Sequence, residues 1–358
     1  TMVNKNDEFK YHAPIDEYLK LLAIHDEWYF HKRDRMFFEN IEQFCNDYLY
    51  PLNQIGHKKG IEFSPQTKSI IMPSKAKSAY KRMCENGYLA HNHPKSIGGK
   101  GINKTISALA EEMMMSCNSA FFLGISLTES AVLAIDVFAS KNLKNRFLPS
   151  MVTGKWSGTM CLTESHCGTD LGLIKTKAEP KEDHFILNGS KIWITFGEHD
   201  LTENIIHLVL AKLPNAPRGS KGISLFAVPK FLANGKRNSI FCTGIEEKMG
   251  THLSPTCFMQ LDNAQGWLIG EKNKGLHAMF TMMNDARLTV ANQGIALSEI
   301  AMQKLKYNLN QRSQSSDTNA IKLCNGYIRS MRNLMVYINS LEKNSYEISV
   351  LTPTAKSF

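Results

Sequence analysis

The stretch "MCLTESHCGTDLG", from Met160 to Gly172, places hydroxyls and small residues directly after a strand-like run. Thr163 ends the apolar run, and Gly168 and Thr169 lie in the turn that follows. Glycine lets a backbone approach a bulky group closely, while hydroxyls and backbone N–H groups can bond ring heteroatoms or a pyrophosphate. The stretch therefore indicates a site for a large, polar and partly planar molecule.

A second stretch, "GSKIWITFG" from Gly189 to Gly197, supplies an aromatic surface for the same molecule. Alternate side chains of an extended strand share a face, so we expect Trp193 and Thr195 on one face. Ile192 and Ile194 are then expected on the other face, in the core. This leaves a flat indole beside a hydroxyl, which suits packing against a planar ring system.

The pattern alone leaves a structural interpretation open. In it, Trp193 lies in the core, and Thr163 and Thr169 are ordinary strand and turn residues. Glu164 and Asp170 could form an acid–base pair, but a carboxylate at a strand end and one before a helix-like turn are more often solvated or capping.

Three further motifs imitate functional sites. "GGKGIN" at Gly98–Asn103 and "GEKNKG" at Gly270–Gly275 neither follow a buried strand of a βαβ unit nor end in Gly-Lys-Ser/Thr, so we predict turns. His91 and His93 in "HNHP" have no further His, Cys or carboxylate at ligand spacing. We therefore expect no metal site.

Composition and charge limit the class of protein. The 358 residues are 43% hydrophobic, without repeats or low-complexity blocks, which predicts a globular protein. The net charge of +9 would attract a polyanion such as nucleic acid, a phosphate-bearing cofactor or coenzyme A. Because no block of five or more like charges occurs, we expect no dedicated nucleic-acid arm.

Cysteine usage and hydropathy bear on the compartment. Eight cysteines without a close C-x-x-C pair predict reduced, mostly buried thiols. No apolar run approaches the ~18 residues that a membrane span needs, and the first ten residues lack the apolar core of a signal peptide. We expect a cytoplasmic protein without a membrane span.

The spacing of apolar residues divides the chain into three zones. Helical spacing dominates residues 1–155, short β-like runs dominate 156–272, and helical spacing returns over 273–358. The zones predict an α+β fold with an N-terminal helical domain, a middle antiparallel β domain that is barrel-like, and a C-terminal helical domain. Asn118 or Ser119 is expected to interrupt a long helix of the first zone.

Several segments resemble the acyl-CoA dehydrogenase family of flavoproteins. "MCLTESHCGTDLGLIKTKAEP" and "ILNGSKIWITFG" look like its two signature segments, and "GEKNKGLHAMFTMMNDARLTVANQGIALSEIAM" looks like the entry to its C-terminal helical bundle. The similarity runs from about Pro14 to Phe358. It is greatest to the large subfamily that includes 3-methylmercaptopropionyl-CoA dehydrogenase, through "YLYPLNQIGHKKG" and "EEKMGTHLSPTC". The family fold agrees with the three zones.

The resemblance implies FAD as the cofactor and an acyl-CoA thioester as the substrate. Trp193 would pack on the flavin, with Thr195 near its reactive nitrogen edge. Arg312 and Gln314 would reach the FAD pyrophosphate of a neighbouring subunit, although Ser315 replaces the usual glycine there. The implied cofactor-binding residues are Met160, Leu162, Thr163, Gly168, Thr169, Trp193, Thr195, Arg312 and Gln314.

Substrate contacts are implied for Thr169, Asn284 and Arg287. Asn284 and Arg287 lie three residues apart, hence on one face of a helix, where the family contacts coenzyme A. A polar stripe on a helix surface is the structural alternative for this pair.

The catalytic carboxylate of the family is not identified in this sequence. In most of the family it follows the segment that "LTPTAKSF" resembles, so we expect it beyond Phe358, in a C-terminal part that the chain lacks. Some relatives carry it immediately before the Arg of "MMNDARL", where Ala286 stands here. Asp285 is rotated by about 100° around the helix and has a shorter reach, so it is not predicted as the base.

The implied activity is α,β-dehydrogenation in fatty acid metabolism. A carboxylate removes the α proton while the β hydrogen leaves as hydride to the flavin. Electrons would pass to an electron-transfer flavoprotein, and the protein would form a homodimer or homotetramer. Two alternatives stay open: a non-dehydrogenating flavoprotein of this fold that binds nucleic acid, and an inactive acyl-CoA-binding scaffold.

Overall fold

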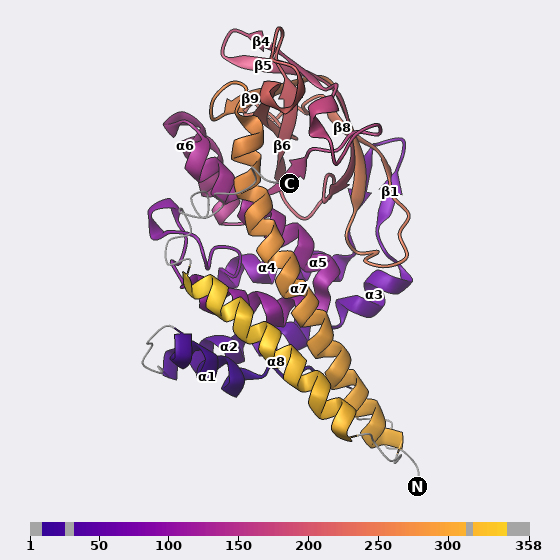
Figure 1. Ribbon diagram of the computed structural model, residues 1–358. Coiled ribbons are helices and arrows are strands. Elements are labelled where there is room, and N and C mark those ends of the chain that lie inside the picture. The colour runs from indigo at the N-terminus through magenta and orange to yellow at the C-terminus, as the bar shows by residue number, and fades with distance from the viewer. Residues whose placement is uncertain (1–8, 26–31, 313–317, 342–358) are drawn as a thin grey trace. The chain divides into compact units, whose positions relative to one another are not determined.

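The chain is helical, then stranded, then helical again. The computed structural model describes residues 9–25, 32–312 and 318–341. Helices dominate up to Val152, strands run from Trp156 to Ile269, and helices return from Gly275 (Figure 1). This order confirms the predicted α+β fold, while the domain boundaries at 155/156 and 272/273 stay a prediction.

Two compact units are built from segments that are distant in sequence. The first contains the described parts of Thr1–Gln54, Ile102–Phe122 and Arg287–Phe358, and the second contains Ile55–Gly101 and Leu123–Ala286.

The second unit is built around a sheet that closes on itself. Its strands are β3 (Trp156–Cys161), β4 (Lys177–Lys181), β5 (His184–Thr195), β6 (Asn204–Lys212), β7 (Ile223–Pro229), β8 (Ile240–Ile245) and β9 (Thr256–Ile269). The pairing runs β6-β4-β5-β9-β7 and returns to β6, with β3 on β6 and β8 on β9. Most pairings are antiparallel, but β3 and β4 pair parallel to β6. The closed path agrees with the predicted barrel-like domain.

Sequence pattern explains which strands form the core of this unit. β6 and β7 read "NIIHLVLAK" and "ISLFAVP", and nearly every residue in them is buried. Continuous apolar runs of this kind are typical of strands covered on both faces. β4 and β5 form a hairpin in which most polar residues are exposed or half-buried, and they are neighbours in Figure 1.

Helices and a short hairpin complete the second unit. They are β1 (Glu62–Ser64), β2 (Ser69–Ile71), α4 (Ser74–Asn86), η2 (Lys95–Ile97), α6 (Lys141–Val152), η3 (Leu171–Leu173) and η4 (Gly219–Gly222), together with residues 123–138 of α5 (Lys104–Phe138) and residues 275–286 of α7 (Gly275–Arg312). α6 begins at an N-cap, because the side chain of Ser140 accepts a hydrogen bond from the Leu143 N–H. α3 (Leu52–Lys58) crosses the boundary between the two units.

The long helix α5 (Lys104–Phe138) is kinked at Asn118, as predicted. Asn118 has φ −154° and ψ 84°, and its Oδ1 accepts a hydrogen bond from the Phe121 N–H at 3.0 Å. Its side chain therefore caps a second helical segment in mid-helix.

The same helix corrects the prediction about membrane-length segments. By length and composition α5 could cross a membrane, and 78% of its most apolar window is buried inside the structure. The prediction that no apolar segment is long enough to span a membrane was wrong. Scattered polar residues interrupt α5, but the mean hydropathy of its most apolar window stays high. Its burial is that of a core helix.

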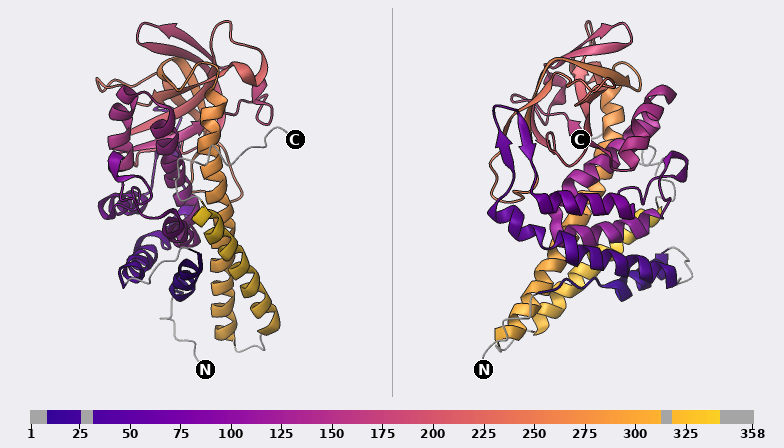
Figure 2. Two further views of the ribbon diagram at one scale, coloured as in Figure 1. Left: turned by 60° about the vertical axis from the view of Figure 1, so that its left-hand side comes forward. Right: turned by 180° about the vertical axis from the view of Figure 1, so that it is seen from behind.

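The first unit packs four further helices around the N-terminal half of α5. They are α1 (Ile15–His25), α2 (Lys32–Phe44), the part of α7 (Gly275–Arg312) from Arg287 onward, and α8 (Thr318–Leu341). α7 and α8 lie side by side (Figure 2), joined by a cluster of Ile295, Met302, Ile328 and Met335. A π-helical turn, η1 (Cys45–Leu49), follows α2.

All eight cysteines are free thiols, and six of them are buried. This confirms the prediction of reduced, mostly buried cysteines.

Candidate functional site

A β-bulge in β5 presents Trp193 on the surface. Lys191 pairs with Met259 and Ile194 with Cys257, so Ile192 and Trp193 together oppose one residue of β9. Trp193 has φ +58°, which a bulky residue rarely adopts, and its side chain is 55% exposed. An exposed indole on a strained backbone is typical of a functional position rather than a core position.

The bulge also changes which neighbours face the core. Ile194 is buried as predicted, but Ile192 is only half-buried and Lys191 is fully buried. The prediction that Ile192 faces the core was wrong. It assumed strict alternation of side chains, but the extra residue of the bulge changes which side chains face the core between Lys191 and Ile194. Thr195 is half-buried.

One hydrogen bond fixes the orientation of the indole. Trp193 Nε1 donates to Glu246 Oε2 at 2.9 Å, and Glu246 directly follows β8. The ring edge is thereby tied to the protein while much of the indole surface stays accessible.

The loop after β3 lies beside this strand. The Ile192 N–H donates to the Thr163 carbonyl at 2.9 Å, which joins the two stretches singled out in the sequence. Thr163 and Leu162 are half-buried, and Gly168 and Thr169 are exposed. A Cβ on Gly168 would lie 3.2 Å from Thr163 Cγ2, so glycine keeps this corner open.

The hydroxyls of this region are available to a ligand. Among the described residues, no hydrogen bond is formed by the side chains of Thr163, Thr169 or Thr195. Met160, predicted to line the same site, is half-buried at the end of β3. The three threonines offer hydrogen-bond donors and acceptors in the same two stretches that carry Met160 and the exposed indole.

Glu164 corrects an interpretation from sequence. It is 4% exposed and accepts hydrogen bonds from Lys191 Nζ at 2.8 Å and from Thr176 Oγ1 at 2.6 Å. It therefore neither lies in solvent nor caps a helix, because its partners come from residues that are distant in sequence. Burial alone would raise the pKa of Glu164, but the Lys191 ammonium and these hydrogen bonds lower it below its usual value.

Asp170 behaves as predicted. Its side chain accepts a hydrogen bond from the Gly172 N–H at 2.9 Å and caps η3. Glu164 and Asp170 thus have separate structural partners and form no acid–base pair. The two glycine-rich motifs are turns, as predicted, with Gly98 and Gly270 in left-handed conformations.

Glu164, His166 and Cys167 have ligand atoms within 4.8 Å of one another. Both Glu164 oxygens already accept hydrogen bonds, including one from a buried ammonium. His166 Nε2 lies 3.0 Å from the Leu173 carbonyl. A cation here would have to displace Lys191, so we assign no metal to this set.

On α7, the predicted substrate-binding residues differ in exposure. Asn284 is half-buried and Arg287 is exposed. Asp285 is buried, and its Oδ2 accepts a hydrogen bond from Ser130 Oγ at 2.7 Å, which agrees with its exclusion as the base. Arg312 is the last residue of α7, and its side chain and the whole of Gln314 lie outside the described residues.

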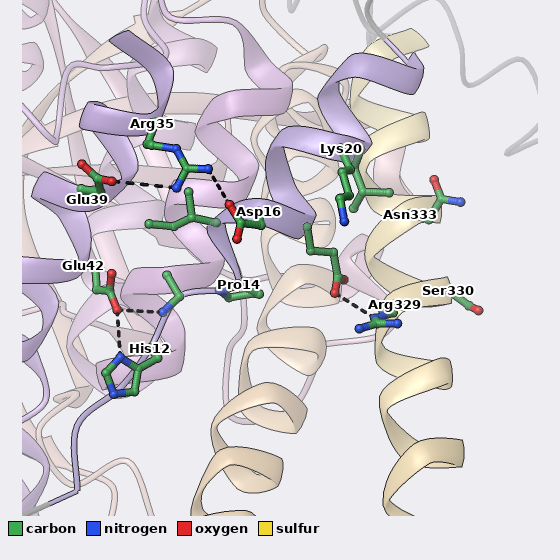
Figure 3. Close-up of a pocket in the computed structure, with 14 residues that line it drawn as sticks. His12, Pro14, Asp16, Lys20, Arg35, Glu39, Glu42, Arg329, Ser330 and Asn333 are labelled. Carbon is green, nitrogen blue, oxygen red and sulfur yellow. Dashed lines mark hydrogen bonds and ion pairs between the residues drawn. The ribbon is translucent and has the colours of Figure 1, made fainter. Parts of the chain in front are cut away.

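A cavity of about 830 Å³ lies in the first unit and contains no residue of these stretches. Figure 3 shows it between α1, α2 and α8, lined by paired charges. Arg35 bonds Asp16 at 2.5 Å, and Arg329 bonds Glu17 at 3.0 Å. Because these charges neutralise one another, we do not place the functional site there.

Comparison with known proteins identifies the family. A model of the acyl-CoA dehydrogenase N-terminal domain matches residues 31–155, and a model of the acyl-CoA dehydrogenase middle domain matches residues 159–264. The chain is 41% identical over 283 residues to 3-methylmercaptopropionyl-CoA dehydrogenase of Ruegeria pomeroyi, across 77% of this chain and 48% of the relative. The chain belongs to the acyl-CoA dehydrogenase family.

Two further relatives agree with this assignment. A butyryl-CoA dehydrogenase of Syntrophomonas wolfei is 39% identical over 260 residues, across 68% of this chain and 42% of the relative. The solved butyryl-CoA dehydrogenase of Megasphaera elsdenii has a TM-score of 0.73 at 22% identity, covering 88% of this chain and 80% of that one, and so supports the fold. The chain spans less than half the length of the two relatives matched by sequence.

The residues of this acyl-CoA dehydrogenase chain fit a flavin. The indole of Trp193 is exposed and oriented, three threonine hydroxyls are free to bond ring heteroatoms, and Gly168 keeps a corner open. Sequence reasoning found these residues but missed Lys191 and Glu246. A lysine inside an otherwise apolar strand pattern was the available signal for Lys191.

Proposed function

We propose that the protein catalyses FAD-dependent α,β-dehydrogenation of an acyl-CoA thioester. The observation that carries the proposal is the backbone hydrogen bond from Ile192 to Thr163, which joins the two signature stretches and so the exposed Trp193 and the threonine hydroxyls that they carry. Bound FAD would accept the β hydrogen as hydride. The rest of the chemistry is binding, orientation and proton removal by protein groups.

The chain's own residues would hold the cofactor in a defined orientation. Trp193 would cover one face of the ring system, with its Nε1–H held by Glu246. Thr163, Thr169 and Thr195 would donate hydrogen bonds to ring or phosphate oxygens. Met160 and Leu162, both half-buried, would add apolar contact.

Proton removal needs a carboxylate near the α carbon of the substrate. Asp285 is held by Ser130, and Ala286 occupies the position where some relatives carry the base. We therefore assign no catalytic base among the described residues. Asn284 and Arg287 are proposed to bind the coenzyme A portion.

Partners are proposed by family similarity. We propose an electron-transfer flavoprotein as the electron acceptor and a homodimer or homotetramer as the assembly, located in the cytoplasm. The relatives named above act on thioesters of different acyl groups, so the proposal extends to the acyl-CoA class.

The purified full-length protein is expected to be yellow and to lose its flavin colour anaerobically when an acyl-CoA is added. Transfer of hydride to the flavin removes the visible absorption of its oxidised form, so a spectrophotometer follows the reaction directly. A set of straight-chain and sulfur-containing thioesters would define the substrate. Colourless protein that fails to take up added FAD would contradict the proposal, whereas yellow protein unaffected by every thioester would leave only flavin binding.

Replacement of Trp193 by alanine is expected to weaken FAD binding about tenfold. Loss of one aromatic stacking contact corresponds to about 1 kcal/mol or slightly more. Because Trp193 is largely exposed, the variant should fold normally. Quenching of flavin fluorescence on titration with apoprotein measures the affinity.

Trp193→Phe is the matched control, since it keeps an aromatic ring and should bind FAD closer to the wild type. Equal affinities of Trp193→Ala and the wild-type protein would remove Trp193 from the proposed site.

A further inference from the structure

One buried ion pair connects the segments that carry the proposed flavin-facing residues. Lys191 on β5 is fully buried and Glu164 is 4% exposed. Lys191 Nζ donates to Glu164 Oε1 at 2.8 Å and to the Leu162 carbonyl at 2.9 Å. The ammonium thus bonds both the side chain and the backbone of the loop after β3.

Glu164 holds both ends of this loop. Its backbone N–H and carbonyl pair with Cys167, at 2.9 and 3.0 Å, and close a tight turn. Its carboxylate accepts from the Lys175 N–H at 2.7 Å and from the N–H and hydroxyl of Thr176 at 3.1 and 2.6 Å. Gly168 and Thr169 lie between these anchor points, so one residue holds the loop on both sides of them, through its backbone at Cys167 and through its carboxylate at Lys175 and Thr176.

Lys191 sets the start of the bulge in β5. It is the last residue in register with β9 before Ile192 and Trp193 depart from the ladder. With its side chain directed inward to Leu162 and Glu164, the extra residue of the bulge leaves Trp193 on the surface. The packing is tight nearby, because a Cβ on Gly189 would lie 2.5 Å from Thr176 Oγ1.

A buried charge pair is a costly way to join two segments. Desolvation opposes it, and removal of one partner leaves an uncompensated charge. Burial lowers the pKa of Lys191 despite the nearby carboxylate of Glu164. Apolar residues could supply stability alone, but the directional bonds of Nζ fix the Leu162 carbonyl and hence the loop.

We propose that Glu164 and Lys191 are positioning residues for FAD, which hold the Thr163–Thr169 loop and Trp193 in the arrangement that receives the ring system. The inference rests on the proposed function. Neither residue touches the cofactor in this proposal. Each acts through the groups that it orients.

The test compares four proteins with the wild type: Glu164→Gln, Lys191→Met, the Glu164→Gln/Lys191→Met double variant, and Glu198→Gln. Glu198 is a matched control, because it is a buried carboxylate of the same unit that pairs with Lys230 and Arg237 instead. Two readouts are taken from each apoprotein: unfolding in urea, and FAD affinity from the quenching of flavin fluorescence.

The double variant decides between positioning and mere stabilisation. It has no unpaired buried charge, so its stability is expected to exceed that of either single variant. It still lacks the bond from Nζ to the Leu162 carbonyl, so its FAD affinity is expected to stay at least tenfold below the wild type, with an altered visible spectrum of the bound flavin. Glu198→Gln is expected to lose stability while keeping its FAD affinity within about twofold.

Two outcomes would overturn the inference. In the first, the double variant recovers its FAD affinity together with its stability. In the second, Glu198→Gln loses as much FAD affinity as a Glu164 or Lys191 variant of the same stability. Wild-type protein that binds no FAD would instead defeat the proposed function itself. If Lys191→Met and the double variant do not fold, Thr176→Val removes one hydrogen bond to Glu164 and should weaken FAD binding two- to fivefold, and unchanged binding would refute the inference.

Discussion

Replacement of Arg332 by methionine is expected to lower the free energy of unfolding by about 3–5 kcal/mol. Arg332 lies on α8 and is 1% exposed, and each nitrogen of its guanidinium bonds a carboxylate. Nε donates to both oxygens of Glu112 at 3.0 Å, and Nη2 donates to Glu112 at 2.7 Å and to Glu299 at 2.8 Å. Nη1 bonds Glu17. One side chain thus joins α1, α5, α7 and α8 of the first unit.

The loss of stability arises mainly because the substitution leaves the buried carboxylate of Glu112 without its counter-charge. Glu112 is completely buried, and without Arg332 only the Tyr18 hydroxyl, at 3.2 Å, remains among its described hydrogen-bond partners. Burial already raises the pKa of Glu112 against the attraction of Arg332. The carboxyl of the variant should therefore take up a proton more readily, so its deficit should shrink as the pH falls.

Urea unfolding followed by circular dichroism at several pH values measures this effect. Arg329→Met is the matched control on the same helix, because Arg329 forms an exposed pair with Glu17 that is worth at most about 1 kcal/mol. A loss below about 1 kcal/mol for Arg332→Met would show that the network contributes little to stability.

Acid is expected to destabilise the protein partly through two buried histidines. His199 is 1% exposed, and burial together with the nearby Lys230 lowers its pKa to about 3. Nδ1 accepts from the Leu201 N–H at 3.2 Å and Nε2 lies 3.0 Å from Ser157 Oγ, an arrangement that suits the neutral ring. Burial, and then Arg237 and Lys230, lower the pKa of His207 well below its usual value.

Because the pKa values of both histidines are lowered in the folded chain, the free energy of unfolding falls as the pH falls. The unfolded chain takes up a proton at each histidine near pH 6.5, whereas the folded chain does not. Stability is therefore fully present above about pH 6.5 and is lost as the pH falls toward the folded pKa. From pH 6.5 to 4.5, His199 alone should remove about 2 kcal/mol, because the slope rises from half of about 1.4 kcal/mol per pH unit at pH 6.5 to nearly the full value at pH 4.5.

His199→Gln should reduce the slope of unfolding free energy against pH by about one proton, whatever its effect on absolute stability. His207→Gln should act in the same way, and the double variant should remove about two protons. Urea unfolding between pH 4.5 and 6.5 measures these slopes. Curves for His199→Gln and the wild type that run parallel would contradict the assignment of a neutral, buried His199.

Much of the fold could be predicted from local pattern. Helical and β-like spacing located the three zones, because apolar periodicity reports which residues face a core wherever the backbone is regular. An interruption of the long helix at Asn118 or Ser119 was predicted, and the structure places it at Asn118, whose side chain caps a new helical segment. The strands "NIIHLVLAK" and "ISLFAVP" are buried as their continuous apolar runs indicate.

Within the candidate site, the sequence by itself determined which groups are present: an indole, several hydroxyls and the glycine of an open turn. Tertiary structure alone decided their orientation. A bulge at Trp193 breaks the two-residue period, so alternation could not predict that Lys191 is buried and Ile192 only half-buried. The contact of these residues with a flavin stays a prediction.

The buried charges show the same limit. Glu164 looks like a solvated carboxylate in its own segment, and its partner Lys191 lies 27 residues away; Arg332 and Glu112 are 220 residues apart. A charge can be buried only where the folded chain brings a counter-charge and hydrogen-bond partners to it. Residue type and local spacing determined the elements and the candidate ligand-binding groups, and only the tertiary structure decided which charges pair inside the core.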